Sequence, residues 1–311
     1  MANELVRMAV LNEYRRQPVR RDEVTRTVTG KEASRVFPVV FAAAQDRLRA
    51  TFAMELVELR ARGAENPLLV QQALALDARI GEKRAHTPED AAAPSNSSAR
   101  AFVLRSTLPA DVTAAMATPD SGHRALLDWR YPDGQLGTIG LLFLVLSIVL
   151  CSGRRIPDAR LRAHLAQLSL SLDRVLPLGL QPLGSGSPDE TLLISSSQHA
   201  ASAGAELLTL DSFLSLLQRQ GYLEKTHATS SADADRTNAR SAAFEWRWGA
   251  RAEAEIGENA VAAFIEQVYG TDKGPKREEG GVGERTGRSV RVSQEELRRQ
   301  MEHAAGSPLV G

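Results

Sequence analysis

Between Ile139 and Cys151 almost every residue is apolar, and only Gly140 and Ser147 interrupt the run. A helix that is apolar on all sides must be buried on all sides, either within a domain or within a membrane. The run is shorter than the roughly 20 residues that a bilayer requires, and Arg154 follows it closely. The pattern therefore predicts a buried helix over 138–151 inside a soluble domain.

A second helix, over 157–172, is predicted after the short extended step Arg155–Ile156–Pro157. Proline suits a first helical turn because its missing N–H would have no partner there, and Asp158 suits the positive end of the helix dipole. Leucines at spacings i, i+4, i+7 and i+11 form one stripe that should face the first helix; they are Leu161, Leu165, Leu168 and Leu172. The two elements predict the start of a helix-turn-helix domain.

The elements that follow complete a winged helix over 137–270. A third helix is predicted over 209–220, ended by Gly221 at the position where glycine favours a left-handed cap. Its apolar face consists of Leu210, Phe213, Leu214 and Leu217. The segments 222–227 and 244–248 then alternate as strands around a second wing, 228–243, and a closing helix is predicted over 252–269.

The first part of the chain predicts another winged helix, over 1–106, because its elements follow the order helix, short strand, helix, helix and hairpin. They are expected at 3–15, 18–20, 21–28, 33–51, 54–59 and 101–106. The fold class is therefore mainly α with small β-hairpins (α+β), as two tandem winged-helix domains.

Three segments outside these elements have compositions typical of linkers or disorder. Residues 60–100, rich in Ala, Pro, Ser and charge, predict a disordered wing insertion, and residues 271–311 predict a disordered tail with one possible short helix near 293–303. We expect both to be dispensable for folding. Residues 107–136 predict a linker, whose apolar group Leu126–Trp129 is expected to pack on a domain rather than to meet a partner.

Composition narrows the possible partners. Lys plus Arg and Asp plus Glu are equal at 38 each, so net charge indicates neither nucleic acid nor membrane, and DNA contact would need a local patch. The single cysteine, Cys151, excludes a disulfide framework and is expected to be a buried core residue. The amino end lacks a basic segment leading into an apolar core, which predicts an intracellular protein.

The residues of a catalytic site are not evident in the sequence. The six histidines are scattered, and neither a P-loop, nor H-E-x-x-H, nor paired zinc-ligand spacing occurs. We therefore expect a protein that is not an enzyme and has no cofactor, metal or small-molecule substrate.

A group of arginines is the candidate DNA-binding site. Its members lie around the turn and helix after 151 and on the second wing: Arg154, Arg155, Arg160, Arg162, Arg240 and Arg247. One interpretation is a basic patch that contacts the phosphate backbone without sequence preference. The other is a solvated surface with local ion pairs, because Asp158 and Glu245 lie among the arginines.

Two stretches of this sequence resemble the MAGE homology domain. The first is the glycine-initiated apolar helix, polar turn, Ile-Pro-acidic step and leucine-striped helix described above. The second is Gly221–Tyr222–Leu223–Glu224 followed by Phe244–Ala252, which resembles the aromatic strand and W-G-P-R-A run of that family. Ala250 stands where the family often has proline. The resemblance spans residues 3–270 with one large interruption.

The resemblance implies a non-catalytic adaptor, most like the MAGE-type non-SMC element subunit of the Smc five–six complex. Such a subunit is nuclear, holds a RING-type subunit and a kleisin subunit, and contacts DNA non-specifically during DNA repair and recombination. The first winged helix would face the RING subunit, and an apolar groove on the second would accept a kleisin helix. The candidate partner-binding residues are Leu210, Phe213, Leu214 and Leu217, together with Ala115 and Met116 at the place of the family's dileucine.

Two alternatives remain open from the sequence. One is a MAGE-type adaptor of a separate RING ubiquitin ligase, and the other is a winged-helix transcription factor. Against the second alternative, Arg219 is the only basic side chain that the predicted third helix offers for reading bases.

Overall fold

The structure is a computed structural model of the 311-residue chain. It describes residues 1–29, 33–61, 64–72, 100–120, 125–126, 135–170, 175–177, 180, 208–227, 244–270 and 294–310. Arg240, the second wing over 228–243, Leu172 and Trp129 lie outside the described residues. So do 73–99 and 271–293, which make up most of the two segments predicted to be disordered.

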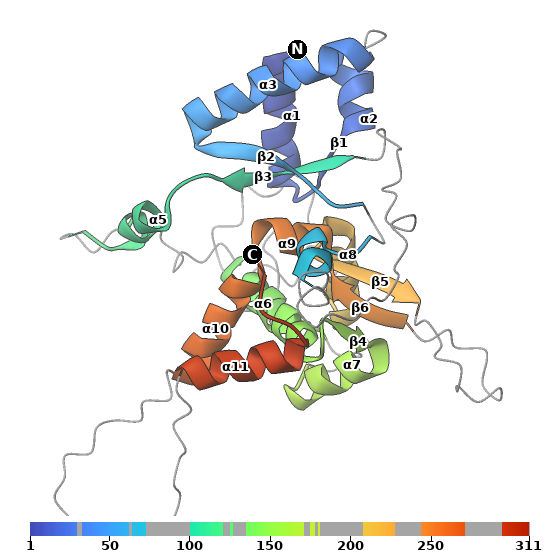
Figure 1. Ribbon diagram of the computed structural model, residues 1–311, viewed down its shortest axis with the longest axis vertical. Helices are drawn as coiled ribbons and strands as arrows, with labels where there is room; N and C mark the ends of the chain where they lie inside the picture. Colours follow the sequence, from blue (N-terminus) through green and yellow to red (C-terminus); the bar gives the residue numbers. More distant parts are fainter. Residues whose placement is uncertain are drawn as a thin grey trace, which may run out of the picture.

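The first winged-helix unit is the upper body in Figure 1. Its sheet has the order β1-β3-β2, and β2 pairs with β3 in antiparallel register, with Leu56 opposite Leu104. This confirms the hairpin predicted across the long insertion. The elements are α1 (Ala2–Tyr14), β1 (Val19–Arg20), α2 (Arg21–Val24), η1 (Thr25–Thr29), α3 (Ala33–Phe52), β2 (Met54–Glu58) and β3 (Ala101–Ser106).

The core of this unit lies between α1, α3 and the sheet. Leu5 and Ala9 of α1 and Ala44 and Leu48 of α3 are fully buried, at the helical spacing that the sequence shows. The rings of Phe37, Phe41 and Phe102 pack beside them with centroids 4.9 to 6.4 Å apart. A helix pair and a three-stranded sheet thus share one apolar layer.

The second winged-helix unit is the lower body in Figure 1 and has the sheet order β4-β6-β5. Its elements are α6 (Gln135–Cys151), β4 (Arg155–Pro157), α7 (Asp158–Gln167), α8 (Leu210–Gln220), β5 (Leu223–His227), β6 (Phe244–Trp248), α9 (Ala250–Glu255) and α10 (Glu258–Gly270). The extended step before α7 is the third strand, which pairs with β6 through Ile156 and Trp246. The predicted closing helix is two helices, because the chain turns at Gly257, where φ is +77°.

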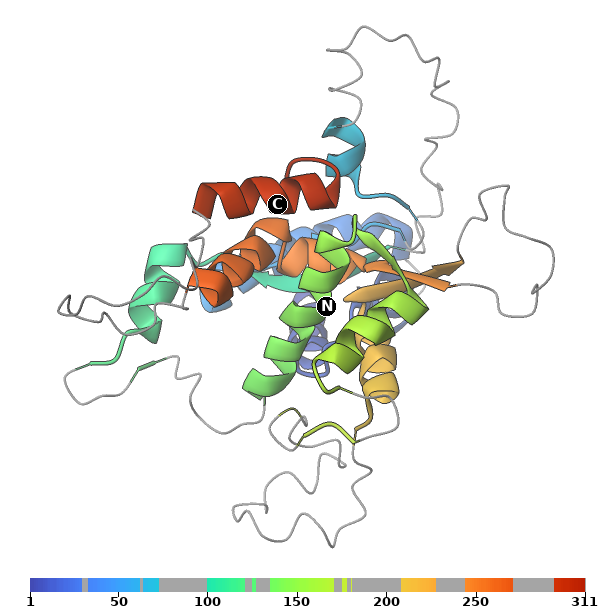
Figure 2. The same ribbon diagram turned by 90° about the horizontal axis from the view of Figure 1, so that it is seen from below.

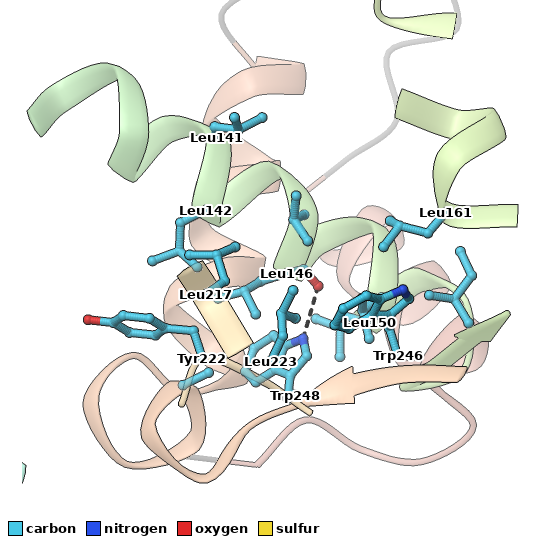
Figure 3. Close-up of a cluster of buried hydrophobic side chains, with 14 of the residues drawn as sticks. Leu141, Leu142, Leu146, Leu150, Leu161, Leu217, Tyr222, Leu223, Trp246 and Trp248 are labelled. Carbon is cyan, nitrogen blue, oxygen red and sulfur yellow. Dashed lines mark hydrogen bonds between the residues drawn. The ribbon is translucent and has the colours of Figure 1, made fainter. Parts of the chain in front are cut away.

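Helix α6 is the centre of the second core, as its unbroken apolar run predicts. Val145, Leu146, Val149 and Leu150 are fully buried, and the indole Nε1 of Trp248 donates a hydrogen bond of 3.0 Å to the Leu146 carbonyl oxygen (Figure 3). That bond satisfies the one polar atom of a buried tryptophan, so the ring can lie inside the core without an unpaired donor.

The turn after β6 depends on Gly249. A Cβ atom at this position would lie 2.1 Å from the carbonyl oxygen of Gly221, so only glycine permits the close approach of the two backbones. The Gly249 N–H donates to the Tyr222 carbonyl at 2.8 Å, and the Arg251 N–H donates to the Gly221 carbonyl at 3.1 Å. This packing is the physical basis of the Trp-Gly step noted in the sequence.

The predicted disordered tail is wrong for residues 294–310. Helix α11 (Gln294–Ala305) packs against α6 and α10, with Met301 and Ala305 buried in the second core (Figures 1 and 2). The composition of the tail suggested disorder because polar residues dominate it. The apolar residues Leu297, Met301 and Ala305, four positions apart, nevertheless form a stripe that this surface buries.

Other segment predictions also need correction. The wing insertion was expected to be disordered from residue 60, yet Arg60 is buried against the second unit and residues 67–72 are helical. The linker contains α5 (Ala110–Ala117), and Leu126 is exposed rather than packed on a domain. Cys151, the last residue of α6, is exposed and not buried. Leu168 is half-exposed because α7 ends at Gln167.

Candidate functional site

Arg154, the first arginine of the predicted DNA-binding group, is not available at the surface. Its guanidinium forms a two-point ion pair with Glu258, with Nε–Oε1 and Nη2–Oε2 distances of 2.6 and 2.8 Å. It also donates to the carbonyl oxygens of Ala305 at 2.7 Å and Pro308 at 3.1 Å and to the Ser307 hydroxyl at 2.7 Å. The basic-patch interpretation therefore does not suit Arg154, because acceptors distant in sequence surround its guanidinium.

Two further members of the predicted group are held in ion pairs. Arg247 is buried and donates to Glu224 at 2.6 Å across the second sheet. Arg162 lies between Asp158 and Asp211, at 2.7 Å from each. The structure thus favours the ion-pair interpretation for these side chains.

Arg155 and Arg160 remain at the surface of the second unit. Arg155 is 48% exposed and pairs at 2.8 Å with Glu65, which is itself exposed. Arg160 is exposed on α7. Of the six predicted arginines, the structure therefore places two in solvent near one another in the chain and leaves Arg240 outside the described residues.

The predicted partner-binding residues separate into two groups. Leu210, Phe213, Leu214 and Leu217 are buried in the second core, so their assignment to an open groove is wrong. An amphipathic face in the sequence is the same whether it meets the protein's own core or a partner, and here it meets the core. Ala115 and Met116 lie on α5, where Ala115 is exposed and Met116 is partly exposed.

Helix α5 exposes its apolar side chains to solvent. Six of its eight residues are apolar (Ala, Val and Met), and none of them is buried. The helix projects from the first unit in Figure 1, with Leu108 and Val112 also exposed. An apolar helix that its own domain does not cover is typical of a protein-interaction surface.

Helix α1 exposes a second apolar stripe. Val10, Leu11 and Tyr14 point away from the core that Leu5 and Ala9 enter, and Tyr14 is 81% exposed. The aromatic side chain with a polar tip is a type enriched at interfaces. The first unit therefore carries apolar side chains in solvent on both α1 and α5.

The two units are joined by a group of charged side chains around Arg60, which we call the Arg60 cluster: Arg60, Glu224, Arg247 and Glu253. The Arg60 guanidinium, only 8% exposed, binds Glu253 at 2.7 and 3.0 Å, Glu224 at 3.1 and 3.2 Å, and the Trp248 carbonyl oxygen at 2.8 Å. Burial opposes the charged form, but the two carboxylates outweigh it and raise the pKa of Arg60. Burial also disfavours the charged form of Glu253 and raises the pKa of that carboxyl, because it outweighs the opposing effect of Arg60.

A second charged group, the Arg251 cluster, joins the units on the other side of α9: Arg251, Glu13, Arg16, Tyr222 and Glu255. Arg251 is fully buried and donates to Glu13 of the first unit at 2.6 Å and to Glu255 at 2.7 Å. The Tyr222 hydroxyl lies 2.9 Å from Glu255, and Arg16 donates to that hydroxyl at 3.1 Å. Burial and then the Glu255 charge raise the pKa of Tyr222 to about 12.

These clusters hold the units in one relative arrangement, and sequence reasoning missed both. Each pairs residues more than 160 positions apart, which no local pattern can indicate. The Arg251 side chain lies in the W-G-x-R-A run, so the resemblance marked the residue but not its role.

The described residues contain neither a candidate metal site nor a candidate membrane-spanning helix. No three His, Cys, Asp or Glu side chains there come together in a way that could hold a metal ion. Nor does the described part include a helix both long enough and apolar enough to cross a bilayer.

The fold and these surfaces define a class of tandem winged-helix proteins. Buried ion pairs join the two units, and the described surface offers apolar contact sites. Within that class, the sequence profile of the MAGE homology domain matches residues 5–259. The chain belongs to the MAGE homology domain family.

Comparison with solved structures concerns the fold alone. The fold is similar to that of a chain in the "Nse1-Nse3-Nse4 complex", with a TM-score of 0.51 and 15% sequence identity over 97% of this chain and 95% of that chain. No curated protein matches this sequence.

Proposed function

We propose that this protein is the MAGE-type adaptor subunit of an SMC-type chromosome maintenance and DNA repair complex in the nucleus. In this role it holds a RING-type subunit on its first winged-helix unit and a kleisin subunit on its second, and it has no catalytic activity of its own. The family match and the likeness to a chain of an Nse1-Nse3-Nse4 complex support the proposal.

The observation that carries the proposal is the uncovered helix α5. Leu108 and Val112 are exposed and Met116 is partly exposed. Ala115 and Met116 stand where the resemblance places the family's dileucine, which contacts a RING subunit in many relatives. Leaving several such side chains in water is unfavourable by about 25 cal/mol per Å² of apolar area, which a partner would recover on binding. The structure of α5 therefore suits a contact with the apolar surface of the RING-type subunit.

The test is co-purification of the three subunits with the V112D/M116D variant of this chain. We expect the variant to lose the RING-type subunit and to keep its own melting temperature, because α5 contributes no buried residue. The matched control is L168D, since Leu168 is half-exposed on the second unit, and it should retain the RING-type subunit. Equal recovery of that subunit with both variants would remove α5 from the contact.

We also propose a non-specific DNA contact, through the two arginines of the predicted DNA-binding group that remain in solvent. Arg155 and Arg160 can neutralise phosphates, whereas Arg154, Arg162 and Arg247 are engaged with carboxylates. The R155E/R160E variant should bind duplexes of different sequence more weakly by a similar factor, and binding by the wild type should fall steeply with salt. The control is R105E, an exposed arginine of the first unit that is also ion-paired. No difference between the two variants in a gel-shift titration would contradict the proposed contact.

A further inference from the structure

The carboxyl-terminal segment is bound to the second unit in the manner of a peptide ligand. The Arg154 guanidinium donates to the backbone carbonyl oxygens of Ala305 and Pro308 and to the Ser307 hydroxyl. Glu258 binds both polar backbone groups of Val310: its carboxylate accepts from the Val310 N–H at 2.9 Å, and its own N–H donates to the Val310 carbonyl at 3.1 Å. We call the Arg154–Glu258 pair the clamp.

Most contacts of the clamp are to backbone atoms. Recognition of carbonyl and N–H groups holds an extended segment in place with little regard to its side chains, as in other modes of peptide binding. Specificity then comes from the apolar positions beside the clamp, which here are Leu297 and Met301 on α11 and Val310 in the extended part. Gly306, with φ at +83°, ends the helix and turns the chain into the clamp.

The segment adds little to the core that it covers. Met301 and Ala305 are its buried members of the second core, Leu297 and Leu309 pack against that core, and Val310 is buried. By comparison, α6 and α8 each supply at least four buried residues to the core. Most of α11 is polar and faces solvent, and a 12-residue helix is marginal by itself in water. A segment that is bound mainly by one clamp and a short apolar stripe can be displaced by another segment of the same pattern.

The geometry points to a peptide-binding groove, formed by α6, α10 and the clamp, that residues 294–310 occupy in cis. We infer that a partner segment of the same pattern takes their place in the assembled complex. The pattern is an amphipathic helix with apolar residues four positions apart, then a glycine, then a short extended stretch ending in an aliphatic residue. The replacement in the complex rests on the proposed function, whereas the cis occupancy does not.

A partner segment must compete with residues 294–310, because these residues are covalently linked to the unit that binds them. Residues 271–293 join α10 to α11, and a tether of this length gives a bound segment an effective concentration on the order of 1 mM. A free peptide must therefore overcome the tethered one, and cutting the tether should open the groove to peptides in solution.

The first experiment uses the full chain with a site-specific protease sequence inserted after Gly281. After cleavage and gel filtration, a fluorescent peptide of residues 294–311 should bind the remaining protein with a Kd on the order of 10 µM. The uncleaved protein is the control and should bind the peptide at least tenfold more weakly. A cleaved segment that stays bound at nanomolar concentration and does not exchange with excess peptide would overturn the inference, since α11 would then be a permanent part of the core.

Variants test the clamp itself. In the cleaved protein, R154A should weaken peptide binding at least tenfold, because it removes the guanidinium that binds Ala305, Ser307 and Pro308. R155A is the matched control, since the adjacent Arg155 binds Glu65 instead, and it should leave affinity unchanged. A peptide carrying M301D should not bind. Equal affinity of the R154A and R155A proteins would refute recognition by the clamp.

The second experiment measures hydrogen exchange of the α11 amides in the reconstituted complex. Loss of their protection on assembly supports replacement by a partner segment, and full protection in a complex that forms would overturn it. Failure of the complex to form would instead count against the proposed function, so the two outcomes are distinguishable.

Discussion

The replacement of Arg60 by methionine tests the most specific feature of the interface between the two winged-helix units. Methionine keeps most of the length and apolar stem of the side chain but removes the guanidinium. That group makes contacts at 2.7 and 3.0 Å to Glu253 and at 3.1 and 3.2 Å to Glu224. The substitution also leaves the Trp248 carbonyl oxygen without the donor that lies 2.8 Å away.

The expected loss in the free energy of unfolding depends on which carboxylate loses its ion-pair partner. Breaking a buried ion pair by removing one partner costs roughly 3–5 kcal/mol, because the other charge stays buried. Glu224 keeps Arg247 at 2.6 Å, so Glu253 is the carboxylate that loses its nearest charge. We therefore expect R60M to lower the free energy of unfolding by about 3 kcal/mol, at the lower end of that range.

A double-mutant cycle isolates the interaction. E253Q removes the uncompensated charge, so the free energy of unfolding of R60M/E253Q should exceed that expected from adding the two single losses, by about 2 kcal/mol. The measurement is urea unfolding of the four proteins. The control is R100M, because Arg100 and Glu58 form an exposed pair at 3.3 Å that contributes under about 1 kcal/mol.

One result would refute the reasoning. If R60M lost no more stability than R100M, Arg60 would not be held between the carboxylates of the second unit. Residues 60–72 would then not be held to the second unit through Arg60, in agreement with what the composition of the insertion first suggested.

Three further predictions concern the second unit. Burial disfavours the charged form of Asp158, but hydrogen bonds from Arg162 and Trp246 outweigh it and lower the pKa of this carboxyl. The wild type should therefore have a larger free energy of unfolding than D158N above about pH 4, and this difference should disappear as the pH falls below that value, as measured by urea titrations at several pH values. G249A should lower the free energy of unfolding by about 3 kcal/mol, since its Cβ would lie 2.1 Å from the Gly221 oxygen; a loss under about 1 kcal/mol would contradict that packing. A250P should be neutral or stabilise by about 0.4–1 kcal/mol in thermal unfolding, because Ala250 is the first residue of α9 and Gly249 has φ −82° and ψ 160°, which a following proline favours.

Periodicity predicted the secondary structure well because each element has a short-range physical cause. The apolar run of α6, the end of α8 at Gly221 and the alternation in β6 correspond to burial, a left-handed cap and a two-faced strand. The pairing of β2 with β3 across more than forty residues was predicted from the resemblance and the order of elements, and it is confirmed. Local pattern and fold agree wherever the contacts of an element are made by its own face.

The candidate site was predicted less well, because its physics depends on contacts between distant residues. The apolar face of α8 looked the same in sequence whether a core or a partner would cover it, and the core does. The tail looked disordered because three apolar residues in a polar helix are a weak signal. That stripe is sufficient only because α6 and α10 offer apolar side chains that α11 contacts.

The arginines show how composition should weigh against local clustering. Four arginines within nine residues, 154 to 162, suggest a basic patch, but the whole chain has an acidic residue for every basic one. In such a chain a buried or half-buried arginine has carboxylates available from anywhere in the fold, and Glu258, Asp158 and Asp211 take two of the four. Equal totals of charge therefore favour ion pairs over patches. Within the predicted group, a nucleic-acid contact is then to be sought at the two arginines that the fold leaves in solvent, Arg155 and Arg160.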